Sequence, residues 1–135
     1  LVLSTLHTVT AIQTVERILN FFPPERHKTL RQELAMVLRG IVSQRLVPAT
    51  RGGWIPATEI LIATATLAAL IRDGQTHELE KTLADGTHFG MHTFNQSLLA
   101  LAKSGWITKE TALEASDSPQ DLRMALQGIT RSTRV

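Results

Sequence analysis

One histidine directly follows an apolar segment at the start of the chain. Residues 1–6 read LVLSTL, a run of aliphatic and β-branched side chains that predicts a strand buried on both faces in a parallel sheet. His7 comes next, and in open α/β sheets ligands bind outside the carboxyl ends of the strands. A neutral imidazole there can donate to a phosphate oxygen. His7 is therefore either a ligand-contacting residue or a packed structural histidine.

A second pair of histidines has the spacing of metal ligands. His88 and His92 are four residues apart, which places two imidazoles on one face of a helix. Gly90 lies between them, however, and Thr93 has the character of a cap for the following helix, so we expect a connecting loop and no metal site.

Several classes of chemistry lack their sequence signals. The chain contains no GxxxxGK[ST], GxSxG or HExxH motif and no cysteine. It therefore carries no phosphate-cradling loop, no serine or cysteine nucleophile motif, and no thiolate metal site. The lack of cysteine also fits a cytosolic protein.

Basic residues concentrate in the first third of the chain. Residues 1–51 hold seven Lys and Arg against three Asp and Glu, and residues 52–135 hold seven against nine. Arg26, Lys28 and Arg31 lie on the polar side of a predicted helix. This side is either a solvated surface or a surface for phosphate or an acidic partner. A net charge of +2, 4% aromatic residues and no tyrosine argue against nucleic-acid binding.

The residue pattern predicts a mostly helical α/β protein. At 135 residues with 43% hydrophobic content, the chain suits one domain or a small domain with an appendage, and no apolar run is long enough to insert into a membrane. Apolar spacing predicts helices over 11–22 and from about residue 25, then strands over 41–47 and 54–62 joined by a Gly-Gly turn. From residue 64 onward the pattern predicts five short helices.

Five segments, taken in their order along the chain, resemble the type IV pilus twitching-motility ATPases, the PilT and PilU retraction motors. The resemblance covers residues 1–126 and rests on LVLSTLHT, TAIQTVERILNFFPPERH, IVSQRLVP, ATEILIATATLAALIRDG and GMHTFNQSLLALAKSGWIT. NFFPPER is nearer to the PilU branch and LIRDG to the PilT branch, so the branch stays open. Pilus-assembly and type II secretion ATPases, which commonly carry a four-cysteine zinc element, remain an alternative within the superfamily.

The resemblance implies part of a hexameric cytoplasmic motor that hydrolyses ATP with Mg²⁺ to power pilus retraction at the inner-membrane pilus machinery. It implies the trailing part of a RecA-like P-loop ATPase domain over 1–63, a C-terminal helical subdomain over 64–128, and a disordered tail or non-native remnant over 129–135. The family's P-loop and Walker B segment precede the matching part. We therefore expect the chain to begin inside the family's His box, to bind no nucleotide tightly and to be inactive alone.

The resemblance also implies roles for particular residues. His7 aligns with the second histidine of the His box, near the γ-phosphate, and Thr8 lies beside it as a further nucleotide contact. Residues 66–73, TLAALIRD, align with the retraction motif AIRNLIRE through Leu70, Ile71, Arg72 and Asp73. Half of the motif's polar residues are replaced here, and the same stretch also fits an amphipathic helix packed into the core.

The expected partners are further copies of the chain and an inner-membrane platform protein. A second hypothesis treats the chain as a helical interaction module, whose basic face of Arg26, Lys28 and Arg31 docks on a neighbouring subunit or on that platform.

Overall fold

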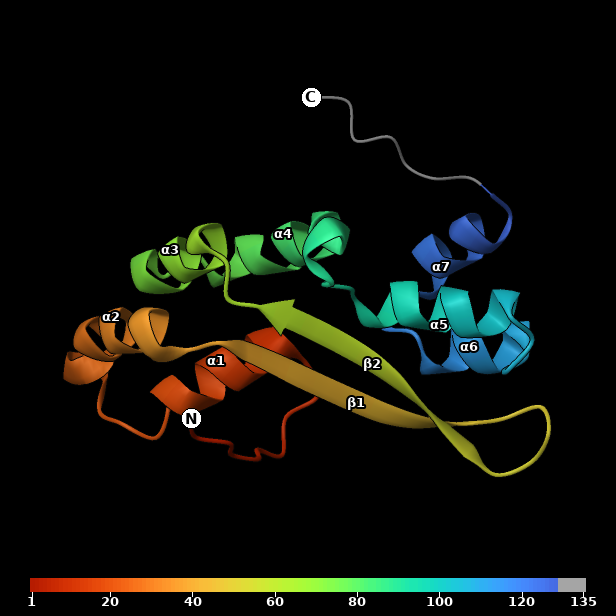
Figure 1. Ribbon diagram of the computed structural model, residues 1–135, viewed down its shortest axis with the longest axis horizontal. Coiled ribbons are helices and arrows are strands. Elements are labelled where there is room, and N and C mark those ends of the chain that lie inside the picture. The colour runs from red at the N-terminus through yellow and green to blue at the C-terminus, as the bar shows by residue number, and fades with distance from the viewer. Residues whose placement is uncertain (129–135) are drawn as a thin grey trace. The chain divides into compact units, whose positions relative to one another are not determined.

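The computed structural model describes residues 1–128, and the predicted tail over 129–135 lies outside the described residues (Figure 1). The described chain divides into two compact units. The first contains residues 1–44 and 59–93, and the second contains residues 45–58 and the chain from residue 94 onward. Helices predominate, and one two-stranded sheet is present in the described part, which confirms the predicted mostly helical α/β class. No described helix has the length and apolar character needed to cross a bilayer.

The first unit consists of helices around one hydrophobic core. Its helices are α1 (Ala11–Leu19), η1 (Pro24–Arg26), α2 (His27–Val37), α3 (Ala65–Asp73), η2 (Thr76–Glu78), α4 (Leu79–Asp85) and η3 (Thr87–Phe89). Most of the buried side chains come from α1, α3 and α4, with Ile41, Leu61 and Met91 added from outside these helices. Helix α2 packs against α3 with half-buried leucines. The core includes Val15, Leu19, Ile41, Leu61, Leu67, Ile71, Leu79, Leu83 and Met91.

Local signals in the sequence set where these helices begin and end. Thr10 caps α1 by accepting a hydrogen bond from the Gln13 amide at 3.2 Å. Helix α1 ends before Pro23, as predicted, and α3 ends at Gly74, which has a positive φ of 75°. The predicted left-handed stop at Gly74 is therefore confirmed.

The second unit has its own core beneath three short helices: α5 (Phe94–Lys103), α6 (Lys109–Ala115) and α7 (Pro119–Leu126). Thr108 caps α6 by accepting from the Thr111 amide at 3.1 Å, as predicted. Pro119 is the first residue of α7, also as predicted, but the Ser118 side chain makes no capping hydrogen bond. The buried residues of this core are Val47, Ala57, Phe94, Leu98, Ile107, Ala112 and Leu122.

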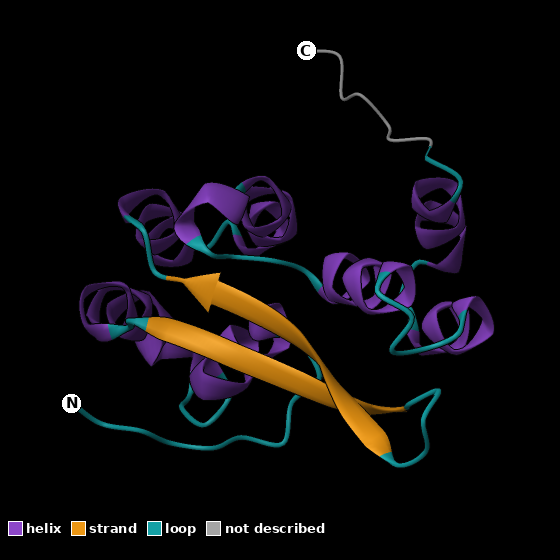
Figure 2. Ribbon diagram, turned by 45° about the vertical axis from the view of Figure 1, so that its right-hand side comes forward, coloured by secondary structure: helices purple, strands orange, loops and turns teal. Residues whose placement is uncertain are grey.

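One β-hairpin contributes residues to each of the two units. Figure 2 draws its two strands in orange. The hairpin consists of β1 (Gly40–Pro48) and β2 (Trp54–Ile62), and Gly52 and Gly53 in its turn both have positive φ. Burial alternates along both strands, so that one face of the hairpin enters the cores. The opposite face leaves Val42, Leu46 and Trp54 exposed.

The predicted strand over residues 1–6 is wrong. Residues 1–8 form no regular element, and Leu1, Val2 and Leu3 are fully or almost fully exposed. A strand needs a hydrogen-bonded neighbour, and within the described residues the only ladder is the one between β1 and β2.

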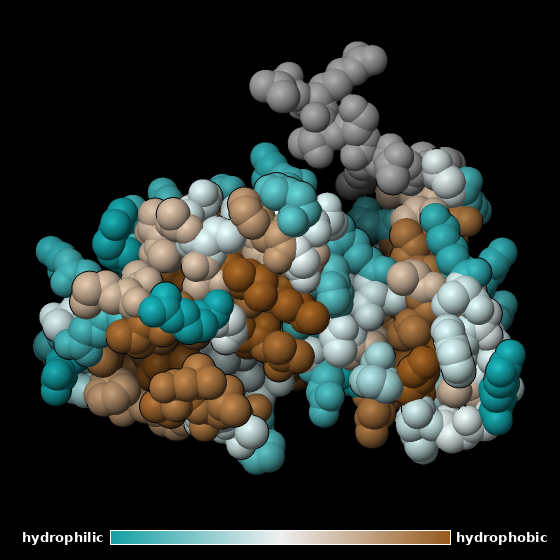
Figure 3. All heavy atoms as spheres, in the orientation of Figure 1, coloured by the Kyte–Doolittle hydropathy of each residue, from teal (hydrophilic) through white to brown (hydrophobic). Residues whose placement is uncertain are grey.

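Figure 3 shows hydrophobic side chains gathered on the face of the first unit that is turned toward the viewer.

The two compact units do not meet at the predicted domain boundary between residues 63 and 64. Helices α3 and α4 share a core with α1 and α2, while residues 45–58 join the helices that follow residue 93. The boundary at residue 63, which came from the family resemblance, stays a prediction about the domains of that family.

Candidate functional site

The loop that carries His7 is tied to the start of α1. The Val9 amide donates to Oε1 of Gln13 at 3.2 Å, and the hydroxyls of Thr8 and Thr14 lie 2.7 Å apart. The Thr14 hydroxyl also donates to the carbonyl of Thr10 at 2.9 Å. These bonds tie the residues that follow His7 to the first two turns of the helix.

The start of α1 is in turn bound to β2. The amide of Ala11, the first residue of the helix, donates to Oε1 of Glu59 at 2.8 Å. Glu59 is only 8% exposed. The first amides of a helix have no acceptor within it and carry partial positive charge, so a carboxylate is a favourable partner there.

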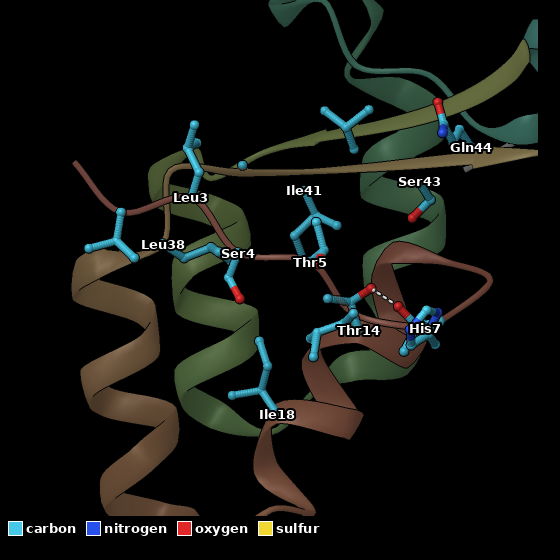
Figure 4. Close-up of a pocket in the computed structure, with 15 residues that line it drawn as sticks. Leu3, Ser4, Thr5, His7, Thr14, Ile18, Leu38, Ile41, Ser43 and Gln44 are labelled. Atoms are coloured by element: carbon cyan, nitrogen blue, oxygen red, sulfur yellow. Dashed lines mark hydrogen bonds between the residues drawn. The ribbon is translucent and has the colours of Figure 1, made fainter.

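A pocket of about 630 Å³ separates the N-terminal segment from β1 (Figure 4). The N-terminal segment, α1 and the end of α2 line it together with the first half of β1, and Figure 4 shows His7 and Thr14 at one end of it and Leu3 and Leu38 at the other. His7 is the one titratable side chain among the 15 described residues that line it: Val2, Leu3, Ser4, Thr5, Leu6, His7, Thr8, Thr14, Ile18, Leu38, Gly40, Ile41, Val42, Ser43 and Gln44.

This lining fits only part of a nucleotide site. The imidazole of His7 and the hydroxyl of Thr8 can donate to phosphate oxygens. No lysine or arginine lines the pocket to neutralise a triphosphate, and in residues 1–128 no three His, Cys, Asp or Glu side chains gather as they would for a metal ion. Within the described residues the pocket therefore offers donors for phosphate oxygens but no cationic side chain.

The predicted motif helix is α3, and its residues divide between core and surface. Ile71 is fully buried and Leu70 half-buried, while Arg72 and Asp73 are exposed and joined by an ion pair of 2.9 Å from Nε to Oδ1. The hydrogen bond from Arg72 lowers the pKa of the Asp73 carboxyl below its ordinary value, and it raises the pKa of Arg72. The helix therefore has a buried apolar side and an exposed ion pair at its end. None of these four residues lines the His7 pocket.

The three predicted basic residues differ in their exposure. Arg26 and Lys28 are exposed, at the end of η1 and the beginning of α2. Arg31 is half-buried, and its guanidinium lies against Gly74, where an added Cβ would be 3.4 Å from its Cζ. Arg26 and Lys28 are therefore available to a partner, while Arg31 packs on the end of α3.

His88 and His92 lie between α4 and α5, as predicted, and not on one helical face. His88 is in η3 with its ring 4.0 Å from that of Phe89. His92 forms a β-bridge with Ile60, through backbone hydrogen bonds of 2.9 and 3.2 Å.

Reasoning from the sequence missed Glu59. Its signal is the strand period: Ala57, Glu59 and Leu61 occupy alternate positions of β2 and are all buried. A carboxylate on the buried side of a strand implies a specific partner, because an unpaired buried charge is strongly unfavourable.

The known proteins that are similar to this chain include two type IV pilus ATPases. The type IV pilus ATPase PilU of Pseudomonas aeruginosa is 43% identical over 94% of this chain and 34% of its own length. The type IV pilus retraction ATPase PilT of the same species is 33% identical over 90% of this chain and 35% of its own. No family model matches the chain.

The fold agrees with these relatives. A crystal structure of the pilus retraction motor PilT with bound ADP superposes with a TM-score of 0.77, at 39% identity, over 87% of this chain and 33% of that one. The chain thus spans about a third of the length of the proteins that it matches. Over nearly all of its residues, the chain is a PilT/PilU-like relative of the type IV pilus twitching-motility ATPases.

Proposed function

We propose that this chain is part of a hexameric cytoplasmic motor ATPase that powers type IV pilus retraction at the inner-membrane pilus machinery. The observation that carries this proposal is the superposition on the ADP-bound PilT motor at 39% identity over 87% of the chain. The similarity to PilT, which is named a retraction ATPase and a pilus retraction motor, favours a retraction motor over a pilus-assembly or type II secretion ATPase.

The test is the complete reading frame that encodes the chain. We expect a GxxxxGK[ST] motif upstream of Leu1, Mg²⁺-dependent ATP hydrolysis by the purified product, and restored twitching zones when the gene is expressed in cells lacking their own retraction ATPase. A product that hydrolyses no ATP, or that restores piliation in an assembly mutant but no twitching, would contradict the proposal.

Within that motor, His7 and Thr8 are proposed to contact the terminal phosphate of the nucleotide. Their place at one end of the pocket, and the absence of any other titratable lining residue there, support this assignment. In the complete protein, His7→Ala should lower kcat by about 10²-fold, the range found when a positioned donor to the reacting group is lost. His77→Ala is the matched control because His77 is an exposed histidine of the same unit outside the pocket. Equal activities of the two variants would refute the role.

The 135-residue chain alone is proposed to be inactive. Its pocket has one imidazole and several hydroxyls but no cationic lining residue, so its affinity for a triphosphate should be weak. Titration calorimetry with ATP and Mg²⁺ tests this, and micromolar binding by the chain alone would refute it.

The second candidate is a helical interaction module that docks on a neighbouring subunit or the inner-membrane platform protein. The exposure of Arg26 and Lys28 favours it. Reversing both charges to glutamate should weaken assembly, and more so at low salt, because exposed charges are screened beyond about 10 Å at 0.1 M salt. Lys81→Glu, an exposed site elsewhere in the first unit, is the control. Unchanged assembly and unchanged retraction by the double variant would exclude the candidate.

A further inference from the structure

Glu59 carries a buried carboxyl group. It lies on the inner side of β2 with an exposure of 8%, and its strand neighbours on that side, Ala57 and Leu61, are both fully buried. A carboxylate in such a place is retained only when it is hydrogen-bonded, because burial without a partner strongly disfavours the charged form.

The carboxylate binds the first amide of α1. Its Oε1 accepts from Ala11 at 2.8 Å, across 48 residues of sequence. The other acceptor at this helix end is Thr10, which receives the Gln13 amide. Thr10 directly precedes the helix in the chain, whereas Glu59 belongs to a strand. Glu59 therefore fixes the helix start to the sheet.

The position of His7 depends on that helix start. In the part of the chain that the structure describes, His7 makes no hydrogen bond or ion pair. Its loop is held by Thr8 and Val9, which bond to Thr14 and Gln13 of α1. The residues that follow His7 are thus tied to the first two turns of α1, and the first amide of that helix is bound by Glu59.

We propose that Glu59 is a positioning residue for the nucleotide-site histidine: by binding the Ala11 amide, it holds the His7 loop at the end of the pocket. The consequence for turnover rests on the function proposed above for His7, but the positioning itself does not. A purely structural capping role would instead change the stability of the unit and leave the place of His7 unchanged.

The experiment compares the wild-type chain with Glu59→Gln, which keeps an oxygen acceptor, and Glu59→Leu, which removes it. Glu16→Leu is the control, because Glu16 is an exposed carboxylate on the same helix. NMR spectroscopy follows hydrogen exchange at the Ala11 amide, exchange at the Val15 amide in the helix interior, and the ring resonances of His7.

In Glu59→Leu the Ala11 amide should exchange at least about tenfold faster, as expected when a bond to a charged acceptor is lost, and the His7 ring resonances should move. Val15 should change far less. Glu59→Gln should keep the exchange rate of Ala11 near that of the wild type while shifting its ¹⁵N resonance, because a neutral amide oxygen is a weaker acceptor.

The proposal is overturned if Glu59→Leu leaves the Ala11 exchange and the His7 resonances unchanged, or if Ala11 and Val15 accelerate equally. If the leucine variant does not fold, Glu59→Gln decides the matter: an unchanged Ala11 ¹⁵N resonance overturns the proposal.

A second arm uses the complete protein. Glu59→Leu should lower kcat with little change in the KM for ATP, and Glu59→Gln should recover most of the loss. If the wild-type protein hydrolyses no ATP, the proposed function fails while the NMR result on Glu59 stands. If it does hydrolyse ATP and the NMR arm is negative, the positioning role fails alone.

Discussion

Arg45 joins three parts of the second unit. From β1, its Nη1 donates to the carbonyl of Ala115, at the end of α6, at 3.0 Å. Its Nη1 and Nη2 donate to the carboxylate of Asp117 at 2.9 and 2.5 Å, and its Cζ lies 4.1 Å from the centre of the Phe94 ring. The side chain of Arg45 is 19% exposed and that of Asp117 is 59% exposed. Water therefore screens the ion pair more than it screens the contacts with the carbonyl and the ring.

Replacing Arg45 by methionine keeps an apolar stem and removes all three polar contacts. A hydrogen bond from a charged donor contributes about 1.5 kcal/mol. A cation–π contact contributes about 0.5 to 1 kcal/mol. An ion pair as exposed as this one contributes about 0.5 kcal/mol. Arg45→Met should therefore lower the free energy of unfolding of the unit by about 2 to 3 kcal/mol, and Asp117→Asn by only about 0.5 kcal/mol.

Urea unfolding followed by tryptophan fluorescence measures this unit selectively, because the protein's two tryptophans, Trp54 and Trp106, both lie in it. With an m-value of about 1.5 kcal/mol/M, the midpoint of Arg45→Met should fall by about 1.5 M. The exposed Arg123→Met in the same unit is the control and should stay within about 0.3 M of the wild type. A shift for Arg45→Met no larger than the control's, or an equal shift for Asp117→Asn, would refute this account of Arg45.

Three further changes test other parts of the structure. Gly86→Ala would place a Cβ 2.0 Å from Cε of buried Met91, so it should lower stability by about 1 to 2 kcal/mol in thermal unfolding. Because the crowding needs both side chains, a double-mutant cycle with Met91→Ala should give less than additive losses, and additivity would argue against crowding. The pKa of Asp73 is lowered mainly by the hydrogen bond from Arg72, so this pair stabilises the fold at neutral pH and the stabilisation is lost as pH falls through the folded-state pKa. NMR titration should show the Asp73 midpoint rising in Arg72→Ala, and an unchanged midpoint would contradict the pairing. Thr10→Ala removes the cap of α1 and should lower stability by about 1 kcal/mol, whereas Thr10→Asn should not, and equal melting temperatures for the two would count against the cap.

Much of the fold could be predicted because its signals are local. The end of α1 before Pro23, the Gly-Gly turn of the hairpin and the stop of α3 at Gly74 depend on a few neighbouring residues. The segment at residues 1–6 was predicted wrongly for a related reason. Its composition records a preference for extended backbone but says nothing about whether a strand lies beside it to pair with.

The candidate site likewise contains some residues that the sequence could reveal and others that it could not. His7 could be singled out because it follows an apolar run, although the strand predicted for that run does not form, and Thr8 was named only through the family resemblance. The groups that organise the two units act instead across long stretches of sequence. Glu59 binds an amide 48 residues away, and Arg45 binds a carboxylate 72 residues away. No sequence pattern within one helix or strand reveals such a partner, because the tertiary structure determines which distant residues come together.

Each unit is formed from two separate stretches of the chain, and this has a consequence for folding during protein synthesis. Once residue 93 has left the ribosome, every residue of the first unit has been delivered, while the second has received only residues 45–58. Val47 and Ala57, which end up buried against α5, α6 and α7, must wait for those helices to be translated. A nascent chain stalled at this stage presents an uncovered apolar strand face, which is the kind of surface that favours chaperone binding or aggregation. The second unit therefore matures after the first, and its folding depends on the translation of residues 94–126.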